Sequence, residues 1–470
     1  MPDLLMIMFL LPLIGCLFAM LAPKNTGNAF NVAIFTMSAE LLMILLLFSK
    51  IGDDETATRH IMQTYDWINV LNLKISFGIN SFSLIILLGV YLALIIGLAG
   101  LAEQMRKNKS LMLVMLYFVW TMTGFFIADD IVSFYIFYAA MLLPMFMLSG
   151  LFGYDRNTLP VSRFFMYNFC GVFCLLAAMA FLYRFYHGNI LLENIAFIDM
   201  NKRIGIAVWL MSCFAFISRI PVWPFHYWFS SVNYGVKNPL VYIVGNMLPL
   251  TGLYAMIRFW PLCVPESVEL LVPFIEILSI LTMIFIALIG FANKEFLYKL
   301  FSYNTVYYML FLLAVILPTD TLKMNIAYSL FIFMIVGASL VVLDIKMEEK
   351  NVGNDGNYHG MLAYMPKFAK VLSFFVLIAI GLPISSFFWS NFVLISALFA
   401  QNVVIGTFVV LAICLVATSL INELYDMHIQ SSSVNQYSGV TDLSNTEVMF
   451  WMSVISLLLL SFFDPMWFVF

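Results

Sequence analysis

Charged residues are scarce in this chain. Asp, Glu, Lys and Arg make up 10% of its 470 residues, whereas a soluble chain would carry about 25%. Hydrophobic residues make up 63%. The formal net charge of −4 and the lack of a basic run exclude the usual pattern of a nucleic-acid-binding protein. The composition therefore predicts a polytopic membrane protein.

The sequence also lacks the patterns that hold metals, iron–sulfur clusters or nucleotides. Of its six cysteines, only Cys170 and Cys174 are close together, and no histidine lies near them. No glycine-rich nucleotide loop is present in the sequence. We therefore expect no cofactor or metal site, and we expect the cysteines to pack between helices.

Long apolar runs dominate what remains. A transmembrane helix needs about 20 mostly apolar residues, and the chain holds fourteen such runs, which are too long for barrel strands. The approximate limits of the predicted helices are 3–22, 28–49, 78–101, 109–128, 130–152, 161–186, 204–229, 238–260, 268–292, 301–318, 322–346, 370–397, 402–423 and 446–466. The sequence thus predicts an all-α polytopic membrane protein of about 14 transmembrane helices.

The basic residues predict an orientation in the membrane. Loops after odd-numbered predicted helices hold thirteen Lys and Arg residues, and loops after even-numbered helices hold eight. Positively charged loops tend to stay on the cytoplasmic side. We therefore expect the odd-numbered loops in the cytoplasm and both termini on the outer side.

Few ionisable residues fall inside the predicted helices, where a charge costs roughly 3 kcal/mol on insertion scales. Glu40 lies in the second helix, Arg219 and His226 in the seventh, and Glu276 in the ninth. Each is a candidate for an ion pathway, although Glu40 and Glu276 could equally be protonated or paired with another helix. Arg219 stays charged at any working pH, whereas His226 could carry a proton or simply be hydrogen-bonded.

Three aspartates fall at the ends of predicted helices. Asp129 and Asp130 lie at the start of the fifth helix, and Asp344 lies near the end of the eleventh. Because water is near such ends, we expect these side chains to be solvated caps rather than members of an ion relay.

Two predicted helices are interrupted by proline. The seventh contains Pro221 and Pro224, and the twelfth contains Pro383 after Gly381. Unpaired backbone groups are tolerated at membrane depth only where protein or water satisfies them, so both interruptions are expected to face the protein interior or a hydrated cavity. They lie five helices apart, which predicts two inverted five-helix repeats with discontinuous helices 7 and 12, a transporter architecture.

These boundaries divide one predicted transmembrane domain, residues 1–470, into four parts. Residues 1–108 hold helices 1–3, residues 109–260 the first repeat, and residues 268–423 the second repeat. Residues 424–470 hold a loop and helix 14. The polar stretch SSSVNQYSGVTDLSNTE is typical of such a surface loop.

The interrupted seventh helix carries a specific motif. The stretch RIPVWPFHYW at 219–228 is similar to the pattern K-x-P-x-x-P-x-H-x-W of the antiporter-like membrane subunits of respiratory complex I and Mrp-type multisubunit sodium/proton antiporters. Further matches follow in order along almost the whole chain: FGINSFSL (77–84), DDIVSFYIFYAAMLLPMF (129–146), RFFMYN (163–168), YAMIRF (254–259), KLFSYNTVYYM (299–309), GMLAYMP (360–366) and GLPISSFFWSNF (381–392). The chain most resembles complex I subunit M (mitochondrial subunit 4) and the corresponding D-type membrane component of Mrp antiporters.

The resemblance implies fourteen helices, two inverted repeats, and protons moving along a central file of charged residues. In this sequence Arg219 stands in place of the file's helix 7 lysine, and Asn391 in place of its helix 12 glutamate or lysine. His226 and Lys299 are retained. We expect Arg219 to pair with a carboxylate or to line a wet cavity.

Other positions of the implied file depart from the family. The helix 5 glutamate falls on Ala139, the helix 8 lysine near Leu250, and the helix 11 histidine near Phe333. A relay needs groups that gain and lose a proton near neutral pH, which these side chains cannot do. The sequence therefore predicts the fold more directly than it predicts ion transport.

The leading hypothesis is a membrane subunit of an NADH:quinone oxidoreductase (complex I) or of an Mrp-type cation/proton antiporter complex. It would contribute to H⁺ or Na⁺ translocation beside other membrane subunits in a bacterial inner membrane, without a flavin, iron–sulfur or nicotinamide site of its own. One alternative is a degenerate, non-conducting structural subunit. Another is a stand-alone secondary ion transporter that uses Glu40, Glu276 and Arg219, and a third is a fast-evolving subunit of the mitochondrial inner membrane.

Overall fold

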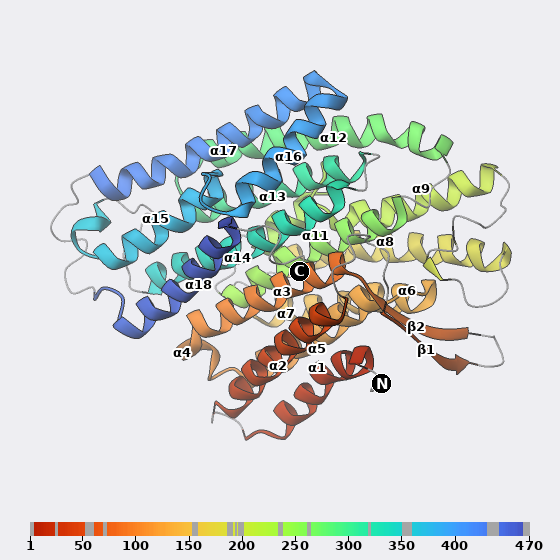
Figure 1. Cartoon of the computed structure of the whole chain (residues 1–470), viewed down its shortest axis with the longest axis horizontal. Helices are drawn as coiled ribbons and strands as arrows, with labels where there is room; N and C mark the ends of the chain where they lie inside the picture. Colours follow the sequence, from red (N-terminus) through yellow and green to blue (C-terminus); the bar gives the residue numbers. More distant parts are fainter. Residues whose placement is uncertain are drawn as a thin grey trace. The chain divides into compact units, whose positions relative to one another are not determined.

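The structure is a computed structural model in which helices form two compact units. It describes residues 4–23, 27–51, 61–68, 73–152, 158–185, 191–192, 195, 202–233, 238–260, 265–317, 321–349, 360–429 and 441–463. The first unit comprises Met1–Leu98 with Ala102–Leu278, and the second comprises Ala99–Leu101 with Ser279–Phe470. Figure 1 shows the helices of both units in chain order.

The first unit contains most of the elements in the N-terminal half of the chain. In order they are α1 (Leu4–Leu21), α2 (Asn28–Ile51), β1 (Ile61–Ile68), β2 (Leu73–Ile79), α3 (Ser81–Gly100), α4 (Ala102–Met105), α5 (Lys109–Ile127), α6 (Ile131–Ala140), α7 (Leu142–Phe152), α8 (Thr158–Phe185), α9 (Lys202–Arg219), α10 (Tyr227–Asn233) and α11 (Pro239–Phe259). Helix α1 packs against α2 and α5, and α9 packs against α8 and α11. The residues of α12 (Pro265–Ala292) are divided between the units.

The second unit contains the remaining helices. They are α13 (Phe296–Val315), α14 (Thr321–Glu349), a short 3-10 turn η4 (Met361–Ala363), α15 (Pro366–Ile380), α16 (Ser386–Gln401), α17 (Val403–Ile429) and α18 (Asn445–Phe463). Helix α14 packs against α16, α15 and α13, and α17 packs against α16, α15 and α13. Nearly every side chain of α13 is buried, which makes this helix the centre of the unit.

The helices bear out the predicted membrane character of the chain. Among the described residues, eleven helical segments are long and apolar enough to cross a membrane. The predicted helices 204–229, 301–318 and 370–397 fall on α9 with α10, on α13, and on α15 with α16. The count of fourteen spans and the inverted repeats stay predictions.

One element was not predicted. Strands β1 and β2 pair antiparallel from Ile61 opposite Ile79 to Ile68 opposite Leu73, with an irregularity between Asp66 and Ile68. The hairpin lies in a polar connection, where the sequence analysis looked only for apolar runs. A purely helical description is therefore incomplete for this stretch.

Both predicted helix interruptions are present. Helix α9 ends at Arg219 and α10 begins at Tyr227, while α15 ends at Ile380 and α16 begins at Ser386. The expectation that both face the interior holds only in part. Pro221 is buried, whereas the side chains of Pro224 and Pro383 are exposed on this chain.

Candidate functional site

The break between α9 and α10 satisfies the carbonyls that its prolines leave without a helical donor. A proline has no N–H for the carbonyl four residues earlier. The carbonyl of Ile217, opposite Pro221, accepts instead from the backbone N–H of Ile220 at 3.0 Å. The carbonyl of Ile220, opposite Pro224, accepts from the N–H of Val222 at 2.7 Å. Both carbonyls that lie opposite a proline are therefore paired.

The break between α15 and α16 uses a different set of donors. Gly381, at φ +91°, ends α15 in the left-handed conformation that glycine adopts without strain. Its N–H bonds to the carbonyl of Ile378, and the N–H of Leu382 bonds to that of Leu377 at 3.1 Å, the Schellman pattern. The carbonyl of Ala379, opposite Pro383, accepts from the hydroxyl of Tyr307. The exposed proline ring therefore leaves no carbonyl unpaired.

Arg219, the last residue of α9, is fully buried. Its Nη1 donates to Thr251 Oγ1 on α11 at 3.0 Å, and its Nη2 donates to the carbonyl of Tyr138 in the last turn of α6. The guanidinium carbon also lies 3.4 Å from the centroid of the Tyr138 ring, a cation–π arrangement. Among the described residues Arg219 makes no ion pair, so the expected carboxylate partner is replaced by a carbonyl, a hydroxyl and a ring.

Tyr138 on α6 contacts α9 through both its backbone carbonyl and its side-chain hydroxyl. Its carbonyl accepts from Arg219, and its hydroxyl donates to the carbonyl of Ala215 at 2.7 Å. The final carbonyls of a helix have no partner within it, which leaves the Tyr138 carbonyl open to the arginine. The next residue in the chain is Ala139, which stands where the family's central file of charged residues has its helix 5 glutamate. The link between these two helices is therefore built from side-chain bonds to backbone carbonyls and a cation–π contact, not from a titratable pair.

Asp129 lies between α5 and α6, beside Arg258 in the last turn of α11, and its side chain is fully buried. Its Oδ1 accepts from Arg258 Nη2 at 2.6 Å, and its N–H donates to the carbonyl of Ser76 in β2 at 2.9 Å. The prediction of a solvated side chain was therefore wrong for Asp129, and it was also wrong for Asp344 on α14, which is buried. The partner that allows the burial of Asp129 lies 129 residues away in sequence, so local pattern could not reveal it.

Asp130 caps the N-terminus of α6, as predicted, but it too is buried. Its Oδ1 accepts from the N–H groups of Val132 and Ser133 at 3.0 and 2.8 Å, and its Oδ2 accepts from the N–H of Ser76 at 2.7 Å. Burial raises the pKa of the Asp130 carboxyl, and the hydrogen bonds from Ser133, Ser76 and Val132 oppose that rise. The two aspartates thus attach the hairpin to the start of α6.

The remaining candidates of the first unit occupy separate places. Glu40 on α2 is fully buried, and within the described part of the chain neither of its carboxylate oxygens has a hydrogen-bond partner. His226 is half-buried in the break after α9. Glu276 is half-buried on α12, next to the exposed side chain of Ile277. Arg219 makes no hydrogen bond with Glu40, so these two do not form one site.

Lys299 forms the principal buried ion pair of the second unit. It lies in the first turn of α13, and its Nζ donates to Glu423 Oε1 on α17. The side chains are 7% and 2% exposed. The sequence analysis found Lys299 but missed Glu423, although this carboxylate closes the predicted helix 402–423. Its position at the boundary of that apolar run was the available signal.

Asn391 on α16 is buried and bonds to α14. Its Oδ1 accepts from Ser329 Oγ at 3.2 Å, and its Nδ2 has no hydrogen-bond partner among the described residues. Phe333, near which the histidine of the family's charged file falls, lies in an aromatic cluster instead. The ring centroids of its neighbours lie 5.2 to 6.0 Å away: Tyr303, Tyr307, Tyr308 and Phe311. None of these side chains exchanges a proton near neutral pH.

Known proteins resemble this chain over almost its full length. The family described as NADH:quinone oxidoreductase/Mrp antiporter, TM, matches residues 128–417. NADH-ubiquinone oxidoreductase chain 4 of Marchantia polymorpha is 24% identical over 456 residues, covering 95% of this chain and 91% of the relative. NADH-quinone oxidoreductase subunit M of Rickettsia typhi is 23% identical over 449 residues, covering 93% and 91%.

Solved structures share the fold. A chain of the respiratory complex I from Thermus thermophilus with bound NADH matches with a TM-score of 0.86 and 21% identity, over 99% of this chain and 96% of that one. A chain of the Mrp complex from Dietzia sp. matches with a TM-score of 0.76 and 17% identity, over 92% and 81%. These likenesses confirm the predicted resemblance and the fold class.

Proposed function

The chain belongs to the NADH:quinone oxidoreductase/Mrp antiporter membrane family, and we propose that it is the antiporter-like membrane subunit of such an assembly. The observation that supports this most directly is the family match over 128–417, which includes both helix interruptions. The chain would contribute to the translocation of H⁺ or Na⁺ that accompanies the assembly's reaction. Its partners would be the other membrane subunits.

We place this multi-pass subunit in a bacterial inner membrane with both termini on the outer side. The excess of basic residues in the odd-numbered loops supports this orientation. Relatives from Rickettsia typhi and Rhodobacter capsulatus agree with a bacterial assembly, and the relative from Marchantia polymorpha agrees equally with the mitochondrial alternative. One transmembrane domain with two inverted repeats is part of the same proposal.

Within each of the two units, the ion path would pass buried or half-buried polar residues. Arg219, His226, Lys299 and Asn391 are the residues proposed, with Glu423 added as the partner of Lys299. Ionisable residues inside membrane helices are costly and mark ion paths, which favours including this buried pair.

A second candidate is a structural subunit that conducts nothing. It is favoured by the partners of Arg219, a carbonyl, a hydroxyl and a ring, because none of them takes up a proton near pH 7. The aromatic surroundings of Phe333 favour it too.

The decisive experiment measures ion flux through the reconstituted assembly. Proteoliposomes carrying the wild-type assembly would be compared with those carrying Arg219→Ala, His226→Ala or Lys299→Gln, with a pH-sensitive dye inside. Lys74→Gln is the matched control, since Lys74 is half exposed and pairs with Asp66 on the hairpin. A conducting subunit predicts lower flux in the three variants and unchanged flux in the control.

Two other results would overturn parts of the proposal, and a third would narrow it. Intact assemblies with unchanged flux in all variants would establish the structural role. Purification of the chain as a monomer with substrate-driven currents would establish a stand-alone transporter. Flux driven by a sodium gradient alone, without proton movement, would restrict the ion to Na⁺.

A further inference from the structure

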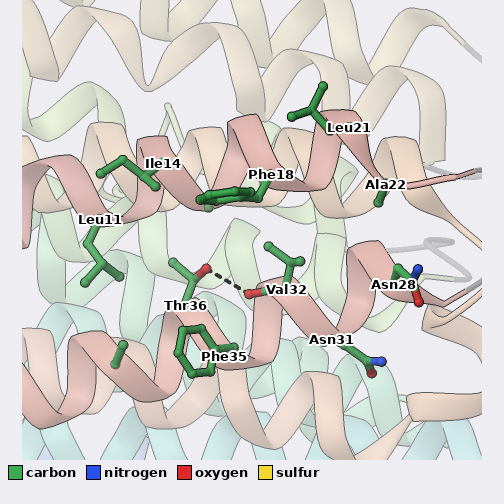
Figure 2. Close-up of a pocket in the computed structure, with 12 residues that line it drawn as sticks. Leu11, Ile14, Phe18, Leu21, Ala22, Asn28, Asn31, Val32, Phe35 and Thr36 are labelled. Atoms are coloured by element: carbon green, nitrogen blue, oxygen red, sulfur yellow. Dashed lines mark hydrogen bonds between the residues drawn. The ribbon is translucent and has the colours of Figure 1, made fainter.

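A groove runs between α1 and α2 in the first unit. Its volume is about 600 Å³, and its wall is almost entirely apolar. Figure 2 shows that the lining side chains come from two neighbouring helices. Ala22, Asn28 and Asn31 lie at one end of the groove, and Leu11 lies toward the other.

A glycine lies where the two helices that form the groove approach each other, and large, exposed side chains flank the groove. The helices approach so closely at Gly15 that a Cβ there would lie 2.4 Å from Thr36 Oγ1. Phe18 on α1 is 61% exposed and Phe35 on α2 is 75% exposed. The apolar lining matches the chemistry of a lipid acyl chain.

Basic side chains gather at the end marked by Ala22 and Asn28. Lys109 donates from Nζ to the carbonyls of Met20 and Ala22 at 2.7 and 2.5 Å, and so holds its charge at the end of α1. The Arg106 guanidinium lies 5.5 Å from the ring centroid of Phe30 on α2. Lys107 is exposed beside it. Glu103 is the acidic residue of this loop, so the local balance is positive.

We propose that this groove binds an anionic phospholipid, with an acyl chain between α1 and α2 and the phosphate at Arg106 and Lys107. The charge complementarity is the argument for an anionic rather than a neutral headgroup, because basic residues at a membrane surface attract anionic lipid. The orientation agrees: the connections after α1 and α3 both belong to the odd-numbered loops that are predicted on the cytoplasmic side. The inference is independent of whether the subunit conducts ions.

Photo-crosslinking tests the proposal in the intact assembly. Membranes containing the full complex would be loaded with phosphatidylglycerol or phosphatidylcholine that carries a diazirine in the acyl chain, and the adducts mapped by mass spectrometry. Phosphatidylglycerol is expected to label residues 11–39 strongly, and phosphatidylcholine weakly. The double variant Arg106→Gln/Lys107→Gln should lower the phosphatidylglycerol labelling about 10- to 30-fold, since each cation contributes about a factor of five.

Three further variants separate lipid binding from misfolding. Arg106→Lys/Lys107→Arg keeps both charges and should keep the labelling. Lys367→Gln/Lys370→Gln removes the same charge from the start of α15 and should change nothing at α1 and α2. Ala39→Phe places a large ring in the groove, so it should abolish labelling while leaving the assembly intact.

The outcomes that would overturn the proposal are specific. Equal labelling of residues 11–39 by the two lipids would show that the groove has no preference for an anionic headgroup. Unchanged labelling of the Arg106→Gln/Lys107→Gln variant would show that these two side chains do not bind the phosphate. No labelling in the intact assembly, with crosslinks to a neighbouring subunit instead, would show that protein covers the groove.

Discussion

The hydroxyl of Tyr307 donates to the carbonyl of Ala379, the one carbonyl that Pro383 deprives of its helical donor. A related contact exists in the first unit, where the hydroxyl of Tyr138 donates to the carbonyl of Ala215 in α9. In each unit a tyrosine on one helix thus supports the helix that is interrupted. The fifth and tenth predicted helices supply these tyrosines.

Tyr307→Phe should destabilise the protein by about 1–2 kcal/mol, because the carbonyl of Ala379 would stay buried without a donor. Tyr303→Phe is the matched control. Tyr303 belongs to the same aromatic cluster on the same helix, and its buried hydroxyl has no hydrogen-bond partner among the described residues. Thermal unfolding of the purified protein in detergent measures both. Equal losses in the two variants would contradict the role given to the Tyr307 hydroxyl.

Gly381→Ala should destabilise the protein by about 1–2 kcal/mol through backbone strain alone. Gly381 has φ +91°, yet no heavy atom lies within 4 Å of the position where a Cβ would be placed. Gly150→Ala is the control, since Gly150 lies within α7 and its Cβ would meet only Val161 at 3.8 Å. There alanine should be neutral or stabilise by up to about 1 kcal/mol. The same thermal unfolding assay would contradict the argument if Gly381→Ala were neutral.

The sequence predicted those features whose signals are local. The apolar runs predicted the helices. Pro221 and Pro383 predicted the interruptions, because a proline removes a hydrogen bond to a carbonyl only four residues earlier in the chain. Asp129 was misinterpreted because Arg258, which pairs with it, is far away in sequence. Glu423 was missed for the same reason, since only the packing of α17 against α13 makes it the partner of Lys299. The β1–β2 hairpin was missed because its strands are short and partly exposed, so no apolar run marks them.

Asp130→Ala should loosen the hairpin as well as α6. The substitution removes an N-cap, worth about 0.5–2 kcal/mol, together with the acceptor for the N–H of Ser76. Hydrogen exchange in the peptide that contains Leu73–Ile79 should therefore become faster. Asp66→Ala, which removes only an exposed pair with Lys74 on the hairpin, should leave that exchange nearly unchanged. Faster exchange in the control alone would contradict the proposed anchoring.

Glu423→Gln should destabilise the protein by about 3–5 kcal/mol, because it leaves the Lys299 ammonium buried without its counter-charge. Lys299→Met combined with Glu423→Leu should recover most of that loss, since a hydrophobic pair of similar volume avoids the desolvation of both charges. The exposed pair Lys74 and Asp66 provides the control, and its removal should change stability by at most about 1 kcal/mol. A double-mutant cycle measured by unfolding in detergent gives the coupling energy directly. A coupling below that of the exposed pair would mean that Lys299 and Glu423 do not act as a buried ion pair, and it would remove Glu423 from the proposed ion path.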